Sequence, residues 1–419
     1  MLRSRTLATT GLITTLALTV GDCGGGSSSG TPGSSSSSRG SDSSSGSNSS
    51  SSSSGSLGSA SSGGATSSGG ATSSGGFAGD AGNPNGSCSS GVPAQGQPAD
   101  VSEPTAVIGA GTAASCTFSQ LATAVAGGGV ITFNCGSAPV SILVTETLNL
   151  PTDRNTVIDG GNLITLDGAG SVQILRFDHA DFMVNTNGIT LQHIALVNGK
   201  TTPAQAIPAA PAPCSQGFDD GEGGAMYVRD GTVRIIDVTF ENNQAALLGP
   251  DTGGGAVYIL GSMPAYVVGS TFRNNKAANG GGLGTLFVDL NIYNCLFDSN
   301  TATGNGANND DQSECSVMNN GQYEIGSGGN GGALYNDGGS GTNVTVCGTQ
   351  VTNNAAGTGG FGGAIFYTSN DFSGTLTITD SMITGNTGGY WGIPESAGTG
   401  VGVNAKAIVI TNSTVQGYP

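Results

Sequence analysis

A short phrase recurs along the second half of this 419-residue chain, and it constrains the fold more than any other feature. It consists of an apolar anchor, two variable residues and, in five copies, an Asn, and a Gly-Gly-aliphatic step follows further along. Successive anchors are 44, 32, 25, 54, 32 and 32 residues apart. Repeats of about 20–50 residues predict a stacked or radial architecture. The anchors are Leu196, Phe240, Phe272, Phe297, Val351, Ile383 and Val415.

The residues before each anchor alternate between apolar and polar types, as in residues 233–240 and 376–383. A period of two predicts β-strands. Strands this short, with no helices between them, do not fit βαβ units, whereas intervals of 25 and 32 residues suit coils of three short strands each. A propeller blade needs about 40–45 residues, so a 25-residue interval is too short for one. The sequence therefore predicts an all-β parallel β-helix.

Two further features of the repeat fit stacked coils. Coils in such a fold lie about 4.8 Å apart, so the recurring Asn side chains would form an internal hydrogen-bonded ladder. The glycine pairs would provide the bends with positive φ that lead into the next strand. The predicted ladder residues are Asn243, Asn275, Asn300, Asn354 and Asn386.

The repeat resembles a known family pattern. Gly-Gly-Ala followed by an aliphatic residue, in alternation with Phe-x-x-Asn, is similar to the repeat of bacterial polymorphic outer membrane proteins, as at 223–226 with 240–243. More broadly, residues 116–417 resemble right-handed parallel β-helix proteins of the pectin-lyase-like superfamily. The resemblance implies a single right-handed solenoid. Leu121, Ala122 and Val125 fall on one helical face and the glycines at 127–129 end it, which predicts a helix over residues 117–126. The resemblance implies that this helix is the N-terminal cap.

The N-terminal part of the chain has a different composition. Residues 24 to 87 are almost entirely Ser and Gly, which offer too little apolar surface to offset the entropy of the chain. Before this tract, Arg3 and Arg5 precede a short apolar run, which is typical of an export signal. The sequence predicts a signal peptide over 1–23, a disordered tether over 24–100 and a β-helix domain over 101–419.

The end of the signal resembles a bacterial lipobox, in which Cys23 would be lipidated. Asp22 departs from that pattern, and simple secretion after a cut near Gly21 is the alternative. The expected location is therefore the bacterial outer-membrane surface or the extracellular space. Membrane contact is expected only through the N-terminal lipid. A formal charge of −17 argues against nucleic acid as a partner, and polysaccharides or cell-surface proteins remain as candidates.

Seven further cysteines follow the signal, and in an exported protein they indicate disulfides before metal ligands. Cys116 and Cys135 flank one helix-turn-strand unit and are the favoured pair. Cys88, at the edge of the tether, is expected to stay unpaired.

Two insertions carry acidic residues that could hold Ca²⁺ or wall a groove, although solvated loop tips are the simpler interpretation. No other cofactor is expected. Exposed aromatic residues in a Gly-rich loop, Tyr390 and Trp391, are candidates for stacking on sugars. The acidic residues are Asp219, Asp220, Glu222, Asp310, Asp311 and Glu314.

The resemblance also implies a choice of function. Pectin-lyase-like enzymes cleave acidic polysaccharides, yet the Asn-Thr-Asp, Gly-His-Gly and Arg-x-Pro-x-x-Arg signatures of those enzymes do not occur in this sequence. His193 lies on a predicted strand without a nucleophile motif and is interpreted as a surface or edge residue. We expect a surface-displayed adhesion or recognition protein without catalysis. A polysaccharide lyase or glycoside hydrolase is the alternative.

Overall fold

In the computed structural model, every residue described below belongs to one compact unit within residues 71–419. The described residues are 81–204, 221–249, 252–261, 263–304, 316–319, 322–325, 328–369, 371–389, 392–393 and 400–417. Cys23 and most residues of the two acidic insertions lie outside these ranges, as do Tyr390 and Trp391.

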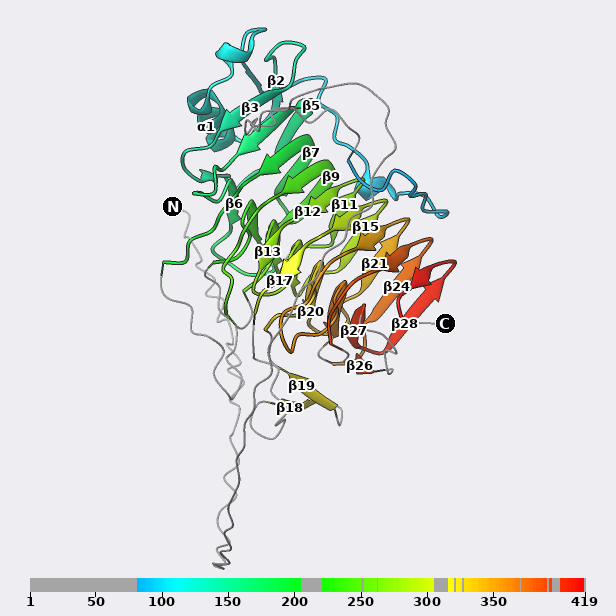
Figure 1. Ribbon diagram of the computed structural model, residues 1–419. Coiled ribbons are helices and arrows are strands. Elements are labelled where there is room, and N and C mark those ends of the chain that lie inside the picture. The colour runs from blue at the N-terminus through cyan, green and yellow to red at the C-terminus, as the bar shows by residue number, and fades with distance from the viewer. Residues whose placement is uncertain are drawn as a thin grey trace, which may run out of the picture. The chain divides into compact units, whose positions relative to one another are not determined.

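Two long sheets of parallel strands dominate the described structure (Figure 1). The first sheet contains β1 (Ala106–Ile108), β2 (Gly129–Phe133), β3 (Val140–Leu143), β5 (Thr156–Asp167), β7 (Gly188–Val197), β9 (Thr232–Glu241), β11 (Ala265–Val268), β12 (Thr271–Arg273), β15 (Leu290–Tyr293), β16 (Leu296–Asp298), β21 (Val344–Cys347), β22 (Gln350–Thr352), β24 (Thr375–Thr379), β25 (Met382–Thr384), β28 (Ala407–Thr411) and β29 (Thr414–Val415).

The second sheet is shorter, and four more strands form two small pairs. The second sheet contains β4 (Leu148–Asn149), β6 (Leu175–Asp178), β8 (Met226–Arg229), β10 (Val257–Leu260), β14 (Leu283–Leu286), β20 (Leu334–Gly338), β23 (Ile365–Ser369), β26 (Gly392–Ile393) and β27 (Val401–Asn404). The small pairs are the parallel β13 (Lys276–Ala277) and β17 (Thr301–Ala302), and the antiparallel β18 (Ser316–Asn319) and β19 (Gln322–Ile325).

The register of the first sheet stacks the anchors of successive repeats. Phe272 is paired with Phe240 on one side and with Phe297 on the other. The three rings are buried, with centroid separations of 4.9 and 4.6 Å. The same column continues through Val351, Ile383 and Val415. The predicted repeat is thus a unit of parallel pairing, and the curled parallel sheets are compatible with a β-helix or another solenoid-like fold.

An amide ladder runs beside these anchors. The side-chain amide of Asn243 donates to Asn275 Oδ1 at 3.0 Å, and Asn275 donates to Asn300 at 2.9 Å. Asn300 continues the series to Asn354, which donates to Asn386. At the last step, the backbone amide of Asn386 donates to Gln416 Oε1 at 2.9 Å. A glutamine side chain therefore terminates the ladder.

The glycine pairs allow the backbones of neighbouring repeats to approach closely. Gly254 has a φ of +67°, which favours glycine. At Gly255 an added Cβ would lie 2.0 Å from the carbonyl oxygen of Gly281 in the next repeat. A side chain at this position would force the two repeats apart.

One helix contacts β1 and β4 near the N-terminal end of the first sheet (Figure 1). It is α1 (Phe118–Gly127), close to the predicted range, and Thr117 caps it by accepting a hydrogen bond from the Gln120 amide. Its buried residues Leu121 and Val125 join the main apolar core. Short 3₁₀ turns span Ala94–Gly96 and Ala113–Ser115. Within the described ranges, no helix is long and apolar enough to cross a bilayer.

The cysteine pairing corrects one prediction. Cys116 and Cys135 form a disulfide, but Cys88 is not an orphan, because it is bonded to Cys347 in β21. Cys295 is the buried free thiol among the described cysteines. The prediction for Cys88 was wrong because residues 81–101 fold back onto the first sheet, which brings two residues 259 positions apart into contact.

The boundary of the tether also differs from the prediction. Residues 81–101, which we call the strap, lie against the first sheet instead of continuing the tether to residue 100. The Cys88 amide donates to Asn294 Oδ1 at 2.9 Å, and the Ala99 amide donates to Gln192 Oε1 at 2.8 Å. Polar and small residues are typical of a linker, but here their backbone amides donate to side chains of the sheet.

Candidate functional site

The candidate site lies where three long strands of the first sheet bend. Each of the strands β5, β7 and β9 has two segments that pair with neighbouring strands. The strand bends between its two paired segments. His193 in β7 has a φ of +52°, and Asp237 in β9 has a φ of +50°. Such left-handed residues interrupt the strand and change its direction. In β5 the register shifts just after Asp159.

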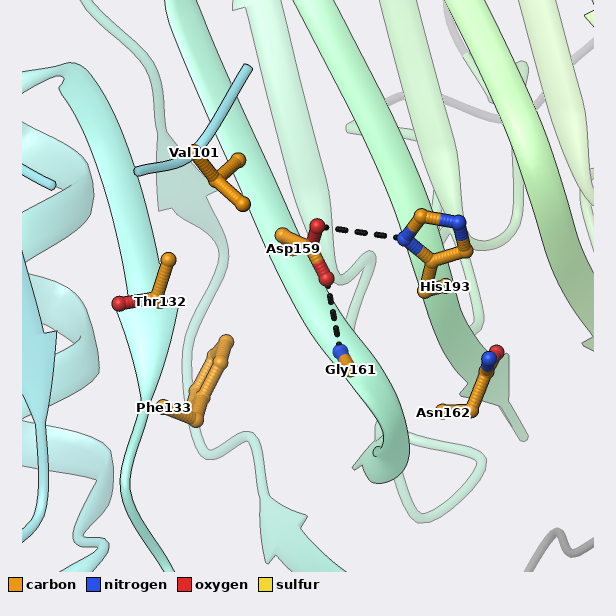
Figure 2. A pocket seen from close by; sticks show the side chains of 7 residues that line it. All are labelled: Val101, Thr132, Phe133, Asp159, Gly161, Asn162 and His193. Atoms are coloured by element: carbon orange, nitrogen blue, oxygen red, sulfur yellow. Dashed lines mark hydrogen bonds and ion pairs between the residues drawn. The ribbon is translucent and has the colours of Figure 1, made fainter. Parts of the chain in front are cut away.

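The bend brings two carboxylates to one imidazole (Figure 2 shows the Asp159 side). His193 Nδ1 lies 3.2 Å from Asp159 Oδ2, and His193 Nε2 lies 3.6 Å from Asp237 Oδ2. The two carboxylates thus approach the ring from its two nitrogens. His193 is partly exposed, so the group faces the outside of the sheet.

Asp159 is held by further donors. The Gln192 side-chain amide donates to Asp159 Oδ2 at 2.7 Å, and the Gly161 backbone amide donates to Oδ1 at 2.8 Å. Burial alone would raise the pKa of Asp159, but hydrogen bonds from His193, Gln192 and Gly161 outweigh burial and lower that pKa. Asp159 is therefore ionised at neutral pH and fixed in orientation.

The same contacts favour the protonated form of His193. The hydrogen bond with Asp159 raises the pKa of His193, partial burial opposes it, and the charges of Asp159 and Asp237 add to the increase. A histidine between two carboxylates is a group whose charge changes near physiological pH. The site therefore carries a hydrogen-bond donor whose strength depends on pH.

An open pocket of about 390 Å³ lies beside this group. Figure 2 shows Thr132 and Phe133 of β2 across from Asp159, with Val101 of the strap near them and Asn162 on the His193 side. Phe133 and Val101 are half-buried, whereas Asn162 is exposed. The pocket thus combines an aromatic wall with an amide, a hydroxyl and an imidazole.

The described residues show what chemistry this pocket can support. Its lining offers hydrogen-bond donors, acceptors and an apolar wall, but within the described lining the only hydroxyl is that of Thr132. A metal is not implied here. Among the described residues, the one group of side chains close enough to hold an ion is Cys88, Cys347 and Asp380, and its two sulfur atoms are bonded to each other.

None of the predicted site residues that fall within the described ranges lines this pocket. Glu222 is the one predicted acidic ligand within the described ranges. It is buried, and its backbone oxygen accepts a hydrogen bond from Gln173. The other predicted ligands, Asp219, Asp220, Asp310, Asp311 and Glu314, lie outside the described residues, as do Tyr390, Trp391 and Cys23.

The sequence carries a signal for this site that the motifs above do not include. His193 and Asp237 each stand three residues before an anchor, at Leu196 and Phe240. The same position in later repeats holds Gly269, Asn294, Gly348, Asp380 and Asn412, and all of them have positive φ. An alignment of the repeats on their anchors would have identified a corner row whose members favour left-handed backbone.

No protein-family model matches the sequence, and neither the curated proteins nor the solved structures give a match.

Proposed function

We propose that this protein is an exported, surface-displayed recognition protein that binds carbohydrate at the His193 pocket without cleaving it. The observation that supports the proposal is the lining of the pocket. The aromatic ring of Phe133 suits the apolar face of a sugar, and Asn162, Thr132 and His193 suit its hydroxyl groups.

A polar strip on the outer face of the first sheet extends this proposal to a polymer. The strip crosses four neighbouring strands, in which Thr190 pairs with Arg234, Arg234 with Tyr266, and Tyr266 with Asn291. Arg234 Nε donates to Thr190 Oγ1 at 3.0 Å. Their neighbours along each strand point into the core, so these four side chains lie on the outer face, where Thr190 is buried and the other three are half-buried. Side chains repeated at about 4.8 Å suit an extended chain ligand.

The charge of the protein favours neutral sugars over uronic acids. The site has two carboxylates for one imidazole, and the whole chain carries a formal charge of −17. An anionic polymer would meet repulsion both at long range and in the pocket. We therefore expect neutral oligosaccharides to bind more tightly than uronic-acid oligomers of equal length.

The finer fold and the location belong to the same proposal. The parallel pairing of successive repeats and the α1 helix at one end support a single right-handed β-helix of the pectin-lyase-like type. An N-terminal signal, lipidation at Cys23 and the Ser/Gly tract would hold this domain at the outer surface of a bacterium.

A glycan-binding experiment tests the proposal. The full chain is applied to immobilised neutral, amino and uronic oligosaccharides, and hits are titrated. Phe133→Ala should weaken binding by about tenfold, because it removes the aromatic wall. Asn162→Gly removes the amide and tolerates the positive φ of that residue. Phe182→Ala, an exposed aromatic outside the pocket lining, is the matched control. Equal losses in the control and the pocket variants would contradict the proposal.

A hydrolase or lyase is the second candidate, because the carboxylates of Asp159 and Asp237 both approach His193, which lines the pocket. Paired carboxylates are the groups that glycosidases use. The same oligosaccharides should be incubated with the protein and assayed for new reducing ends and unsaturated products. Product formation that is lost in Asp237→Asn would replace the recognition proposal with this one.

A further inference from the structure

The strap forms a loop over the sheet, and both of its ends lie at the candidate site. Ala81, at its start, lines a small hollow together with Asp237, and Val101, at its end, lines the pocket. Between them the chain reaches as far as β24, where the Ser89 amide donates to Asp380 Oδ2 at 2.8 Å. The strap thus passes along the corner row and returns to the site.

The first part of the strap, residues 81–88, contacts backbone atoms of the sheet. The Asn83 amide donates to the Asn294 carbonyl oxygen at 2.9 Å, and the Asn83 side chain donates to the Gly348 carbonyl oxygen at 3.0 Å. At Gly86 an added Cβ would lie 2.2 Å from that same Gly348 oxygen. The fit therefore depends on main-chain atoms in close contact, and a small displacement would break it.

Few apolar side chains help to hold the strap. The cluster beneath it consists of Ile236, Val268, Tyr293 and the two bonded cysteines, with Val92 and Tyr266 packed at its edge. Most of the strap is composed of small and polar residues, which gain little from burial. Ordering such a segment costs backbone entropy at every residue. The bond between Cys88 and Cys347 offsets this cost by closing the loop covalently.

The strap also supports the carboxylate of the site. Gln192 makes two hydrogen bonds with the backbone of Ala99, through its Oε1 at 2.8 Å and its Nε2 at 3.2 Å. The same Nε2 donates to Asp159 Oδ2. A continuous series of contacts therefore joins the strap to Asp159 and from there to His193.

We infer that formation of the Cys88–Cys347 disulfide fixes the strap on the sheet and thereby completes the pocket, so that the site matures by oxidation. In the reaction, the two thiols lose two protons and two electrons to a disulfide oxidant. The Cys347 thiolate attacks Cys88 in a mixed disulfide and expels the thiolate of the oxidant. Cys295 does not compete, because its burial raises the pKa of its thiol to about 12 and keeps it protonated. The inference rests on the proposed function only for what the pocket binds.

Hydrogen exchange on the full chain tests the inference without a ligand. In the oxidised protein, the amides of Cys88, Ser89 and Ala99 should be protected by their acceptors. In the Cys347→Ser variant, and in wild type reduced with dithiothreitol, they should exchange faster by about tenfold or more. The amide of Ile235, in the core of β9, should keep its protection. A Cys116→Ala/Cys135→Ala variant is the matched control and should leave the strap protected.

Each outcome decides the question. Unchanged protection of the strap after loss of the bond would overturn the inference, because the strap would then hold itself. Equal loss at the strap and at Ile235 would also overturn it, because the bond would then stabilise the whole fold. Exchange does not depend on sugar binding, so failure of this inference and failure of the proposed function are separate results.

Discussion

Asn300 lies in the middle of the amide ladder, where its side chain both donates and accepts. It donates to Asn354 Oδ1 and to the Phe272 carbonyl oxygen, and its Oδ1 accepts from the side chain of Asn275. The residue is fully buried. Folding therefore replaces the hydrogen bonds between Asn300 and water with hydrogen bonds to neighbouring repeats. If the Asn300 side chain is removed, its buried partners cannot form hydrogen bonds with solvent instead.

We predict that Asn300→Ala lowers the free energy of unfolding by about 1–3 kcal/mol, since it leaves buried donors and acceptors unpaired. The measurement is a urea unfolding midpoint with an unchanged slope. Asn291→Ala is a suitable control because Asn291 is half-buried on the outer face of β15. A similar decrease in the free energy of unfolding for the two variants would show that the ladder contributes no more to stability than a half-buried asparagine on the outer face.

We predict that the interaction between His193 and Asp159 makes the stability of the protein depend on pH. The folded state raises the pKa of His193 above its ordinary 6.5, so the stabilisation is complete below pH 6.5 and is lost as the pH rises through the folded value. The pKa of Asp159 is lowered from 3.8, so its stabilisation is present above pH 3.8 and is lost as the pH falls through the folded value. The pair should therefore stabilise most between about pH 4 and 6.5.

Comparison of wild type with His193→Gln measures the contribution of this interaction to the free energy of unfolding. The difference in unfolding free energy should be largest near pH 5 and should shrink toward pH 8. An NMR titration of the ring should give a midpoint above the ordinary value. A midpoint below it would mean that burial, not Asp159, dominates the environment of the ring.

At the scale of the repeat element, close contacts between the backbones of neighbouring repeats restrict some positions to glycine. We predict that Gly255→Ala destabilises the fold by about 3 kcal/mol or more, because its Cβ would meet the Gly281 oxygen. Gly127→Ala is the matched control, since no atom lies within 4 Å of its added Cβ and its φ is not positive. Thermal unfolding of the two variants gives the comparison. A mild effect at Gly255 would show that the repeats can move apart.

The elements that the sequence predicted correctly are those with a local, repeated signal. The apolar anchors and the alternation before them are read within one repeat, and Phe240, Phe272 and Phe297 accordingly pair in register. The α1 helix was predicted within one residue at each end, because a helical face and a glycine terminus are also local features.

The elements that sequence analysis missed depend on long-range contacts. The Cys88–Cys347 bond and the strap join segments more than 250 residues apart, and the small polar residues of the strap resemble a linker. The His193 site depends on three bends that coincide in space. Only the alignment of repeats on their anchors gives a sequence signal for it.

At the scale of the whole molecule, the boundary of the folded domain follows from the strap. We predict that removing residues 1–80 leaves the unfolding midpoint unchanged, whereas removing residues 1–100 lowers stability by about 2–5 kcal/mol through loss of the disulfide and its contacts. Calorimetry on the two truncated chains distinguishes these outcomes. Equal midpoints would show that the strap contributes nothing to the stability of the sheets.

At the same scale, we propose that the His193 pocket binds carbohydrate. An NMR titration of the full chain with the tightest-binding neutral oligosaccharide tests it most directly, because it locates the contact. We expect saturable shifts at Phe133, Asn162 and His193, with none at Phe182. Saturable shifts confined to other residues, or shifts accompanied by cleavage of the oligosaccharide, would contradict it.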